Sequence, residues 1–299
     1  MHSPHSMRSR PHCTVRALCV FLVTVTVFAA EAVKAQSASG ARVTIPGVET
    51  GFGSSGEVSG TFGRPVKAKD KLPVVLILHG SNGIDGRGAF YAAALQEAGI
   101  ATLEILMFPR GGRPRGSWNN LPHAAAALRW LQAQGEVDAQ RIGVLGFSWG
   151  AGMSVRMSSE LVREKLGAET PRPRALAAMY PVCHSVSSTR APGHPYHGLN
   201  DRMSATPMLI QIGTDDDYEE RERPCDVLRS IWPKQAADVL VIRYIDGATH
   251  AFDGPTSRRF YDEDARGGRG GNVRVTANGT QAAEARETVL RFFVEHLTP

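Results

Sequence analysis

The sequence predicts a doubly wound α/β fold, in which a mostly parallel sheet carries helices on both faces. From residue 73 onward, short apolar runs alternate with segments of helical periodicity. The apolar runs are continuous rather than alternating, as expected of strands that are buried on both faces. The first two runs flank one helical segment, which is the spacing of a parallel crossover unit. We therefore expect one sheet of at least six strands.

The expected elements follow from these runs and from the residues that interrupt them. Strands are expected at residues 73–78, 100–106, 142–145, 175–180, 207–212 and 239–244. Helices are expected at residues 88–98, 121–134, 151–160, 225–234 and 281–297. A short strand at 41–45 and an edge strand at 57–62 are also expected. Residues 184–206 and 253–280 are expected to be loops, and they are the candidates for lids.

Residues 1–35 predict a secretory signal peptide rather than part of a folded domain. Three arginines precede an apolar run of 14 residues, 17–30, and Val33-Lys34-Ala35 provides small residues where a signal peptidase cleaves. The run is short for a bilayer span, and an N-terminal membrane anchor is the alternative. Cleavage after Ala35 leaves residues 36–299 as a single domain, exported to the periplasm or secreted.

The charge of the chain argues against nucleic acid as a partner. The formal net charge is +5, of which +3 falls in the first 35 residues, so only +2 remains for residues 36–299. A balance this small does not predict binding to a polyanion. The arginine clusters at 110–115 and 258–269 are expected in solvated loops.

The cysteines predict one disulfide. Cys13 and Cys19 lie in the predicted signal peptide, so Cys183 and Cys225 alone remain after its removal. Two cysteines in an exported protein favour a bridge, and two free thiols are the alternative. Two isolated cysteines do not make a zinc site, and no metal is expected.

A pentapeptide with a serine at its centre is the first sign of chemistry. Gly146-Phe147-Ser148-Trp149-Gly150 stands between an apolar strand and a segment of helix formers, which is the context of a nucleophile elbow. Such a turn strains the backbone of the serine and leaves room only for small residues two positions to either side. It also places the N–H of Trp149 beside the serine hydroxyl, where the N–H can stabilise an oxyanion.

The second oxyanion donor is expected just after the strongest predicted strand. Ser81 is the predicted donor, and its neighbours Gly80 and Asn82 are alternatives. His79 and Trp118 are candidate wall residues of the site, but packing is the favoured prediction for both.

An acid and a base follow the serine in the order that a nucleophile elbow requires. His250 lies in a loop after the last predicted strand, and it would take the proton of the serine. The acid that orients this imidazole is expected just past strand 207–212, where Asp215, Asp216 and Asp217 are all candidates. The other central histidines precede these acids and have the wrong order: His184, His194 and His197.

Several stretches together resemble the dienelactone hydrolase family. They are Leu78-His79-Gly80, the pentapeptide around Ser148, Gly213-Thr214-Asp215-Asp216, and Tyr244-x-x-Gly247-Ala248-x-His250-Ala251-Phe252. The likeness covers roughly residues 60–297. It implies an α/β-hydrolase fold, no cofactor, and hydrolysis of esters or lactones. It also favours Asp216, because the acid of the family lies three residues beyond such a glycine.

The chain departs from dienelactone hydrolases proper in three ways. Ser148 stands where those enzymes have a cysteine, and the place of the glutamate that pairs with that cysteine lies close to His79. Those enzymes are also usually cytosolic, whereas this chain is predicted to be exported. The differences disfavour dienelactone itself as the substrate and favour a serine carboxylesterase.

The sequence therefore predicts an exported serine hydrolase that cleaves carboxylic esters through an acyl-enzyme. Its catalytic residues would be Ser148, Asp216 and His250, with Trp149 and Ser81 as oxyanion donors. The expected partner is a small-molecule ester, without nucleic acid, cofactor or stable membrane association after signal-peptide cleavage; the oligomeric state stays open. An acyl-peptidase or amidase with the same machinery is the second hypothesis. A non-catalytic binding protein on a hydrolase scaffold is the third.

Overall fold

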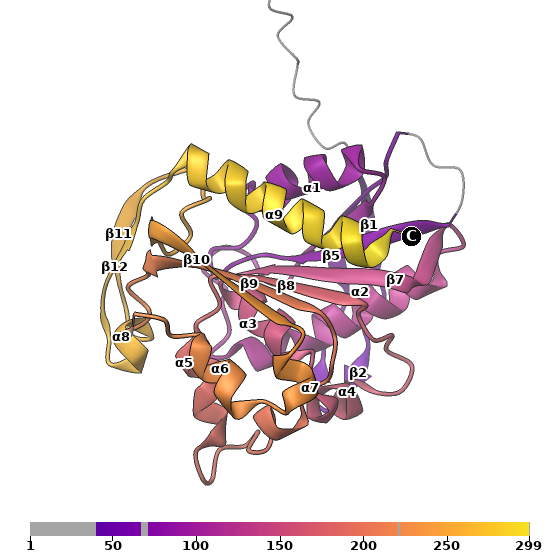
Figure 1. Ribbon diagram of the computed structural model, residues 1–299. Helices are drawn as coiled ribbons and strands as arrows, with labels where there is room; N and C mark the ends of the chain where they lie inside the picture. Colours follow the sequence, from indigo (N-terminus) through magenta and orange to yellow (C-terminus); the bar gives the residue numbers. More distant parts are fainter. Residues whose placement is uncertain (1–39, 67–70, 221, 299) are drawn as a thin grey trace, which may run out of the picture. The chain divides into compact units, whose positions relative to one another are not determined.

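Figure 1 shows the fold in a computed structural model, which describes residues 40–66, 71–220 and 222–298. The predicted signal peptide, residues 1–35, lies outside these described residues. Within them, eight strands form one sheet in the order β1-β4-β6-β5-β7-β8-β9-β10. No helix in the same part of the chain is long and apolar enough to cross a membrane.

The strands of this sheet are parallel except near one edge. The six strands from β6 across to β10 are parallel to one another, whereas β4 runs antiparallel to both β6 and β1. The bounds are β1 Gly40–Ile45, β4 Val58–Gly63, β5 Leu72–Leu78, β6 Ala101–Leu106, β7 Val137–Phe147, β8 Ala175–Met179, β9 Met208–Asp215 and β10 Leu240–Thr249.

Helices cover both faces of the sheet. In Figure 1, α1 (Arg87–Glu97) and α9 (Gly279–Leu297) lie on one face, and α2 (Leu121–Ala133) and α3 (Trp149–Arg156) lie on the other. Helices on both faces of a mostly parallel sheet define a doubly wound α/β fold. The fold class predicted from the sequence is therefore confirmed.

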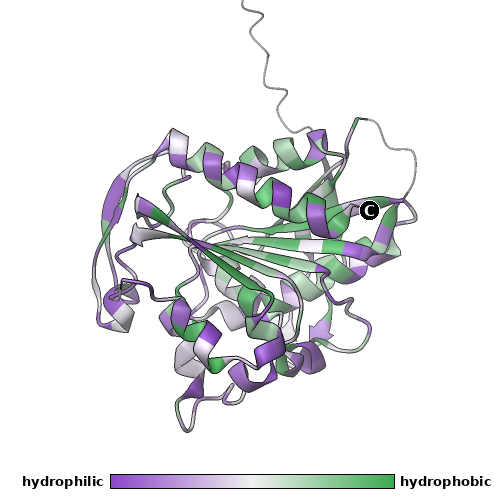
Figure 2. Cartoon of the chain, in the orientation of Figure 1, coloured by the Kyte–Doolittle hydropathy of each residue, from purple (hydrophilic) through white to green (hydrophobic). Residues whose placement is uncertain are grey.

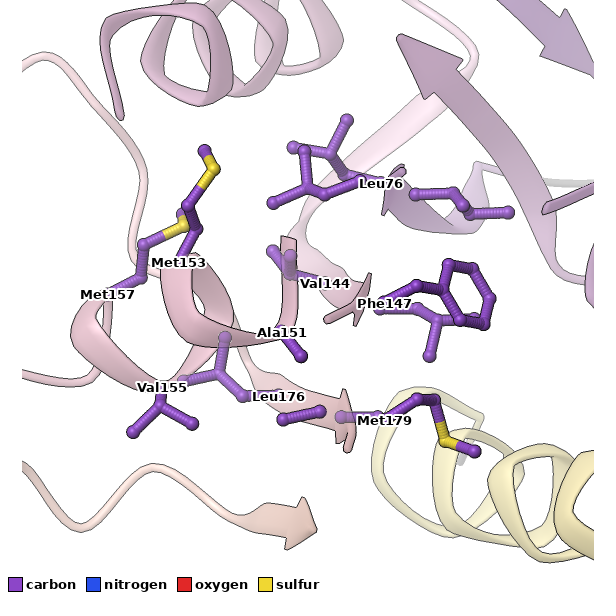
Figure 3. Packing of buried hydrophobic residues seen from close by; sticks show 14 of the residues in the cluster. Leu76, Val144, Phe147, Ala151, Met153, Val155, Met157, Leu176 and Met179 are labelled. Atoms are coloured by element: carbon purple, nitrogen blue, oxygen red, sulfur yellow. The ribbon is translucent and has the colours of Figure 1, made fainter. Parts of the chain in front are cut away.

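The hydrophobic core lies along the middle strands of the sheet. Every residue of β5 is buried, because this central strand is covered on both faces, and Figure 2 shows the middle of the sheet as strongly hydrophobic. Figure 3 shows that β7 and β8 direct buried side chains to both faces of the sheet. Val144 and Leu176 lie on the side of α3, whereas Phe147 and Met179 project toward the opposite face.

Two of the predicted helices are each divided in two. The helix expected at 151–160 ends at Arg156, and the extended backbone of Ser159 separates it from a second helix that begins at Glu160. The helix expected at 225–234 is interrupted at Pro233, because proline lacks the N–H that would continue the hydrogen-bond ladder. The resulting helices are α3, α4 (Glu160–Leu166), α6 (Asp226–Ile231) and α7 (Lys234–Ala237).

The two segments predicted as loops contain regular structure. In the segment 253–280, β11 (Arg258–Asp262) pairs antiparallel with β12 (Gly271–Val275), and α8 (Ala265–Gly268) joins them. Figure 2 shows this hairpin as largely hydrophilic, which is why its sequence resembles a loop. The segment 184–206 contains most of α5 (Cys183–Ser187) and two turns of 3-10 helix.

The strand expected at 57–62 was predicted at an edge of the sheet, and that placement is wrong. It is β4, which lies between β1 and β6, so β1 and β10 are the edges of the described sheet. Edge position depends on pairing with strands far along the chain, and weak alternation in one strand does not reveal it. A small separate hairpin, β2 (Glu49–Thr50) and β3 (Gly53–Ser54), follows β1.

Candidate active site

The turn between β7 and α3 has the geometry of a nucleophile elbow. Ser148 has a φ of 49°, a left-handed value that is strained for any residue with a side chain. A Cβ on Gly146 would overlap the carbonyl of Gly150, and a Cβ on Gly150 would overlap the carbonyl of Leu78. The turn is therefore possible only with glycine at both positions. It leaves Ser148 half-buried at the start of α3.

Three side chains that are far apart in the sequence meet at this turn. Nε2 of His250 lies 2.8 Å from Oγ of Ser148, and Nδ1 of His250 lies 2.8 Å from Oδ2 of Asp216. Ser148 follows β7, Asp216 follows β9 and His250 follows β10. Their meeting is a consequence of the parallel sheet, because the carboxyl ends of its strands share one edge. The aspartate and the histidine are buried.

The structure distinguishes among the three neighbouring aspartates. Only Asp216 contacts His250. Asp215 lies 3.3 Å from the guanidinium of Arg274, and Asp217 accepts a hydrogen bond from the backbone N–H of Arg274. Both of these carboxylates therefore bind the β11–β12 hairpin rather than the imidazole.

The loops of Asp216 and His250 are held together closely. Gly213 lies so near the carbonyl of Ala248 that a Cβ there would overlap it, so glycine permits the two strand ends to converge. The second carboxylate oxygen of Asp216 accepts a hydrogen bond of 3.0 Å from the N–H of Tyr218. The ring of Tyr218 also packs on His250, with centroids 4.4 Å apart. The imidazole therefore has a fixed orientation toward the serine.

A buried polar network lies behind His250, and sequence reasoning did not find it. Asp253 accepts hydrogen bonds from the hydroxyls of Tyr180, at 2.6 Å, and Tyr91, at 2.8 Å. The guanidinium of Arg87 donates to the hydroxyl of Tyr180 and pairs with Asp85 at 2.7 Å. Burial raises the pKa of the Asp253 carboxyl, while the charge of Arg87 opposes that rise. The only sequence signal was the position of Asp253, three residues past the histidine.

A cavity of about 270 Å³ opens on the serine. Ser148 lines it together with both predicted oxyanion donors, Trp149 and Ser81. Trp149 is the first residue of α3, so its N–H has no acceptor within the helix. A Cβ on Gly80 would lie 3.7 Å from Cβ of Ser148, so the Gly80–Ser81 turn borders the serine. The cavity thus brings the serine and both predicted donors together.

The two candidate wall residues have different positions. His79 is buried, and its Nε2 accepts a hydrogen bond of 2.9 Å from the N–H of Met107. It joins the ends of β5 and β6, so the prediction of a packing role is confirmed. Trp118 packs against the core and stacks on Tyr196 with centroids 3.7 Å apart, and it also lines the cavity, so it has both of the roles considered for it.

A disulfide joins Cys183 and Cys225, as the sequence predicts. It connects the start of α5 to the residue before α6, and both cysteines are buried. Ser185 of α5 lines the cavity, so the bridge supports one of its walls. Within the described ranges, no group of three or more His, Cys, Asp or Glu side chains is arranged to hold a metal ion.

The sheet order, the elbow and the edge at which the three side chains meet define an α/β-hydrolase. The chain belongs to the dienelactone hydrolase family, whose profile matches residues 113–297. The match confirms the resemblance seen in the sequence, and membership supports a hydrolase.

Solved structures share this fold at low sequence identity. Esterase 2 of Thermogutta terrifontis, phosphorylated by paraoxon, aligns with a TM-score of 0.63 and 16% identity over 87% of this chain and 96% of its own. A putative dienelactone hydrolase from Klebsiella pneumoniae aligns with a TM-score of 0.59 and 16% identity, over 85% of this chain and 99% of its own. Est1E from Butyrivibrio proteoclasticus aligns with a TM-score of 0.58 and 17% identity, over 87% of this chain and 100% of its own. No curated protein sequence matches the chain.

Proposed function

We propose that the protein is a serine hydrolase that cleaves carboxylic esters through an acyl-enzyme. The observation that supports this most is the continuous line of contacts from Oγ of Ser148 through His250 to Asp216. An alcohol is a weak nucleophile until a neighbouring base takes its proton, and this line supplies that base. The esterases that share the fold are consistent with the same bond type.

In the first half of the reaction, Oγ of Ser148 attacks the ester carbonyl while its proton passes to Nε2 of His250. The carbonyl oxygen becomes an oxyanion, and the N–H groups of Trp149 and Ser81 would donate to it. The carboxylate of Asp216 stabilises the imidazolium that has formed. The imidazolium then gives its proton to the leaving alkoxide, the C–O bond breaks, and an alcohol departs. The acyl group stays on Ser148.

In the second half, a water molecule takes the place of the alcohol. His250 removes a proton from the water as the resulting hydroxide attacks the acyl carbonyl, and the same donors hold the new oxyanion. The bond to Oγ breaks, and His250 returns the proton to Ser148. The products are one alcohol and one carboxylic acid, and the protein is regenerated.

Replacement of the serine tests the proposal directly. Ser148→Ala should lower the kcat for hydrolysis of 4-nitrophenyl butyrate by about 10⁴-fold or more, because removal of a triad nucleophile has effects of this size. Ser230→Ala, on the exposed face of α6, is the matched control and should keep full activity. Full activity of Ser148→Ala would end the proposal. Faster turnover of a peptide amide than of the ester would favour the amidase hypothesis instead.

The three aspartates offer a matched set for the acid. Asp216→Asn should lower kcat by about 10⁴-fold, because the amide favours the wrong tautomer of His250. Asp215→Asn and Asp217→Asn remove the same charge a residue away, and their carboxylates contact Arg274 instead. Equal losses in all three variants would show that local charge, rather than the contact with His250, is what matters.

We also propose that the protein is exported, to the periplasm or the exterior, after loss of residues 1–35. The basic segment, apolar run and small residues before Gln36 support this. The mass of the protein recovered from the exported fraction tests it. An intact N-terminus on protein that stays with the membrane would favour the anchor instead.

A further inference from the structure

Arg156 lines the cavity that opens on Ser148. It is the last residue of α3, the helix that begins just after the serine. Only 4% of its surface is exposed. A cation buried this far is costly unless an opposite charge or a full set of hydrogen bonds compensates it.

The compensation for Arg156 is incomplete. Nη1 donates to the hydroxyl of Ser117 at 3.2 Å, and Nη2 donates to the hydroxyl of Ser185 at 2.9 Å and to its carbonyl at 3.4 Å. Its guanidinium also lies 4.7 Å from the ring centroid of Trp118. Nε has no hydrogen-bond partner, and no aspartate or glutamate in the described part of the chain pairs with this arginine.

Other arginines near the site either pair with an acid or are exposed to solvent. Arg87 is just as buried, and Asp85 pairs with it at 2.7 Å. Arg113 lines the same cavity as Arg156 and lies 3.8 Å from Asp262. Burial lowers the pKa of Arg156 to about 10, which still leaves it charged at neutral pH. Arg115 also lines the cavity and has no carboxylate partner among the described residues, but its side chain is exposed to solvent. Arg156 is therefore the one buried arginine of this cavity without a counter-charge in the described part of the chain.

Gly152 determines where this charge lies. The side chain of Arg156 runs back along α3, and Nη1 would be only 2.6 Å from a Cβ at position 152. Glycine therefore provides the space that the guanidinium occupies. Gly152 donates its N–H to the carbonyl of Ser148, so the guanidinium lies over the next helical turn, about 5 Å along the helix from the serine.

We propose that Arg156, with the hydroxyls of Ser117 and Ser185, forms a subsite for a carboxylate carried by the ester substrate. The inference rests on the proposed function, because it names the class of ester that the same cavity takes. The carboxylate supplies the missing counter-charge, and the planar guanidinium suits its two oxygens. The uncharged part of the substrate then lies against Gly152, between this subsite and Ser148.

The position of the subsite suggests which probes to use. A five-carbon diacid places its free carboxylate about 5 Å from the ester carbonyl, which matches one helical turn. The 4-nitrophenyl half-ester of glutarate carries the charge on the acyl side, and 3-carboxyphenyl butyrate carries it on the alcohol side. Each is compared with its uncharged counterpart, 4-nitrophenyl butyrate or 3-carbamoylphenyl butyrate. The preferred charged ester identifies the side that reaches Arg156.

Selectivity is the readout, expressed as the ratio of kcat/KM for the charged ester to that for its uncharged counterpart. Wild type should favour one charged ester by about tenfold or more, and Arg156→Gln should lower the ratio about 10- to 100-fold. Arg156→Lys keeps the positive charge but loses the planar, two-pronged guanidinium, so its selectivity ratio should lie between those of wild type and Arg156→Gln. Arg42→Gln, an exposed arginine on β1, removes the same charge far along the chain and should leave the ratio unchanged.

Two results would overturn the proposal: no preference of the wild type for either charged ester, or an unchanged ratio in Arg156→Gln. Binding to Ser148→Ala provides a test that needs neither turnover nor a substitution of Arg156. Calorimetry should give tighter binding for glutarate than for the uncharged glutaramide, by about tenfold. Equal binding would also overturn it. Since this measurement does not depend on hydrolysis, failure of the subsite and failure of the proposed ester hydrolysis remain distinguishable.

Discussion

The hydroxyl of Tyr180 donates a hydrogen bond to Oδ1 of Asp253 at 2.6 Å, and both side chains are buried. This contact ties the loop of His250 to the carboxyl end of β8. The ring of Tyr180 also meets the imidazole edge-on, with centroids 5.0 Å apart. The residue therefore contacts the histidine directly and also holds the loop in which it lies.

Tyr180→Phe isolates the role of this hydroxyl, because the ring stays in place. The change leaves Oδ1 of Asp253 and Nη1 of Arg87 each without a partner that they have now. We expect the free energy of unfolding to fall by about 1–3 kcal/mol, as is usual for unpaired buried groups. Urea unfolding measures this. We also expect kcat to fall about tenfold with a smaller change in KM, because the imidazole loses its support.

Tyr261→Phe is the control for that variant. Tyr261 is 67% exposed on β11, and loss of its hydroxyl should change the free energy of unfolding by less than about 0.5 kcal/mol. If both variants unfold at the same urea concentration, the hydroxyl of Tyr180 does not fasten the loop.

The sequence predicts the three residues that meet at the candidate site better than it predicts the residues that support them. Ser148 and His250 are recognisable because each lies in a local pattern, between a strand and a helix or after a strand end. The network behind them has no such pattern. The contact between Tyr91 and Asp253 joins residues 162 positions apart, and it exists only because α1 and the His250 loop pack together. Arg156 was missed for the same reason, since its lack of an acidic partner is a property of the folded cavity.

In the fold, too, features set by a local sequence pattern are predicted, whereas features set by distant contacts are not. The strand expected at 73–78 is found at Leu72–Leu78, because a continuous apolar run is itself the signal of a doubly covered strand. The strands of the β11–β12 hairpin carry charges at exposed positions, so their apolar content is low. The hairpin is bound to the loop of residues 215–218 by contacts such as that of Tyr218 with Asp262, which no local pattern reveals. Position within the sheet, as for β4, is likewise set by distant partners.

The disulfide gives a second prediction. Cys183 and Cys225 are separated by 42 residues, and closing a loop of this length restricts the unfolded chain. Replacing both with alanine should lower the free energy of unfolding by about 2–4 kcal/mol. Urea unfolding of the oxidised wild type and the double variant measures the difference.

A reductant separates the effect of the bridge from that of the substitutions. Dithiothreitol under unfolding conditions should destabilise the wild type by a similar amount and leave the double variant unchanged. Two free thiols in unreduced wild-type protein, found by titration, would contradict the bridge itself.

The third prediction concerns the carboxyl of Glu104 on β6, which lies against Gly88 of α1 and is largely buried. Burial raises its pKa to about 7, and the nearby charge of Asp85 adds to the rise. The unfolded chain loses this proton near pH 4.5, whereas the folded chain keeps it until about pH 7. In that window the folded state binds more protons, so the contribution of Glu104 to stability falls as the pH rises.

Glu104→Gln removes this pH-dependent cost, because an amide stays neutral throughout. Relative to wild type, the variant should gain up to about 3 kcal/mol in the free energy of unfolding between pH 4 and pH 8. Urea unfolding at both pH values measures the change. Glu97→Gln, at the exposed end of α1, is the matched control, because the same substitution there affects a solvated carboxylate. If the difference between Glu104→Gln and wild type is the same at both pH values, the buried carboxyl of Glu104 does not titrate in that window.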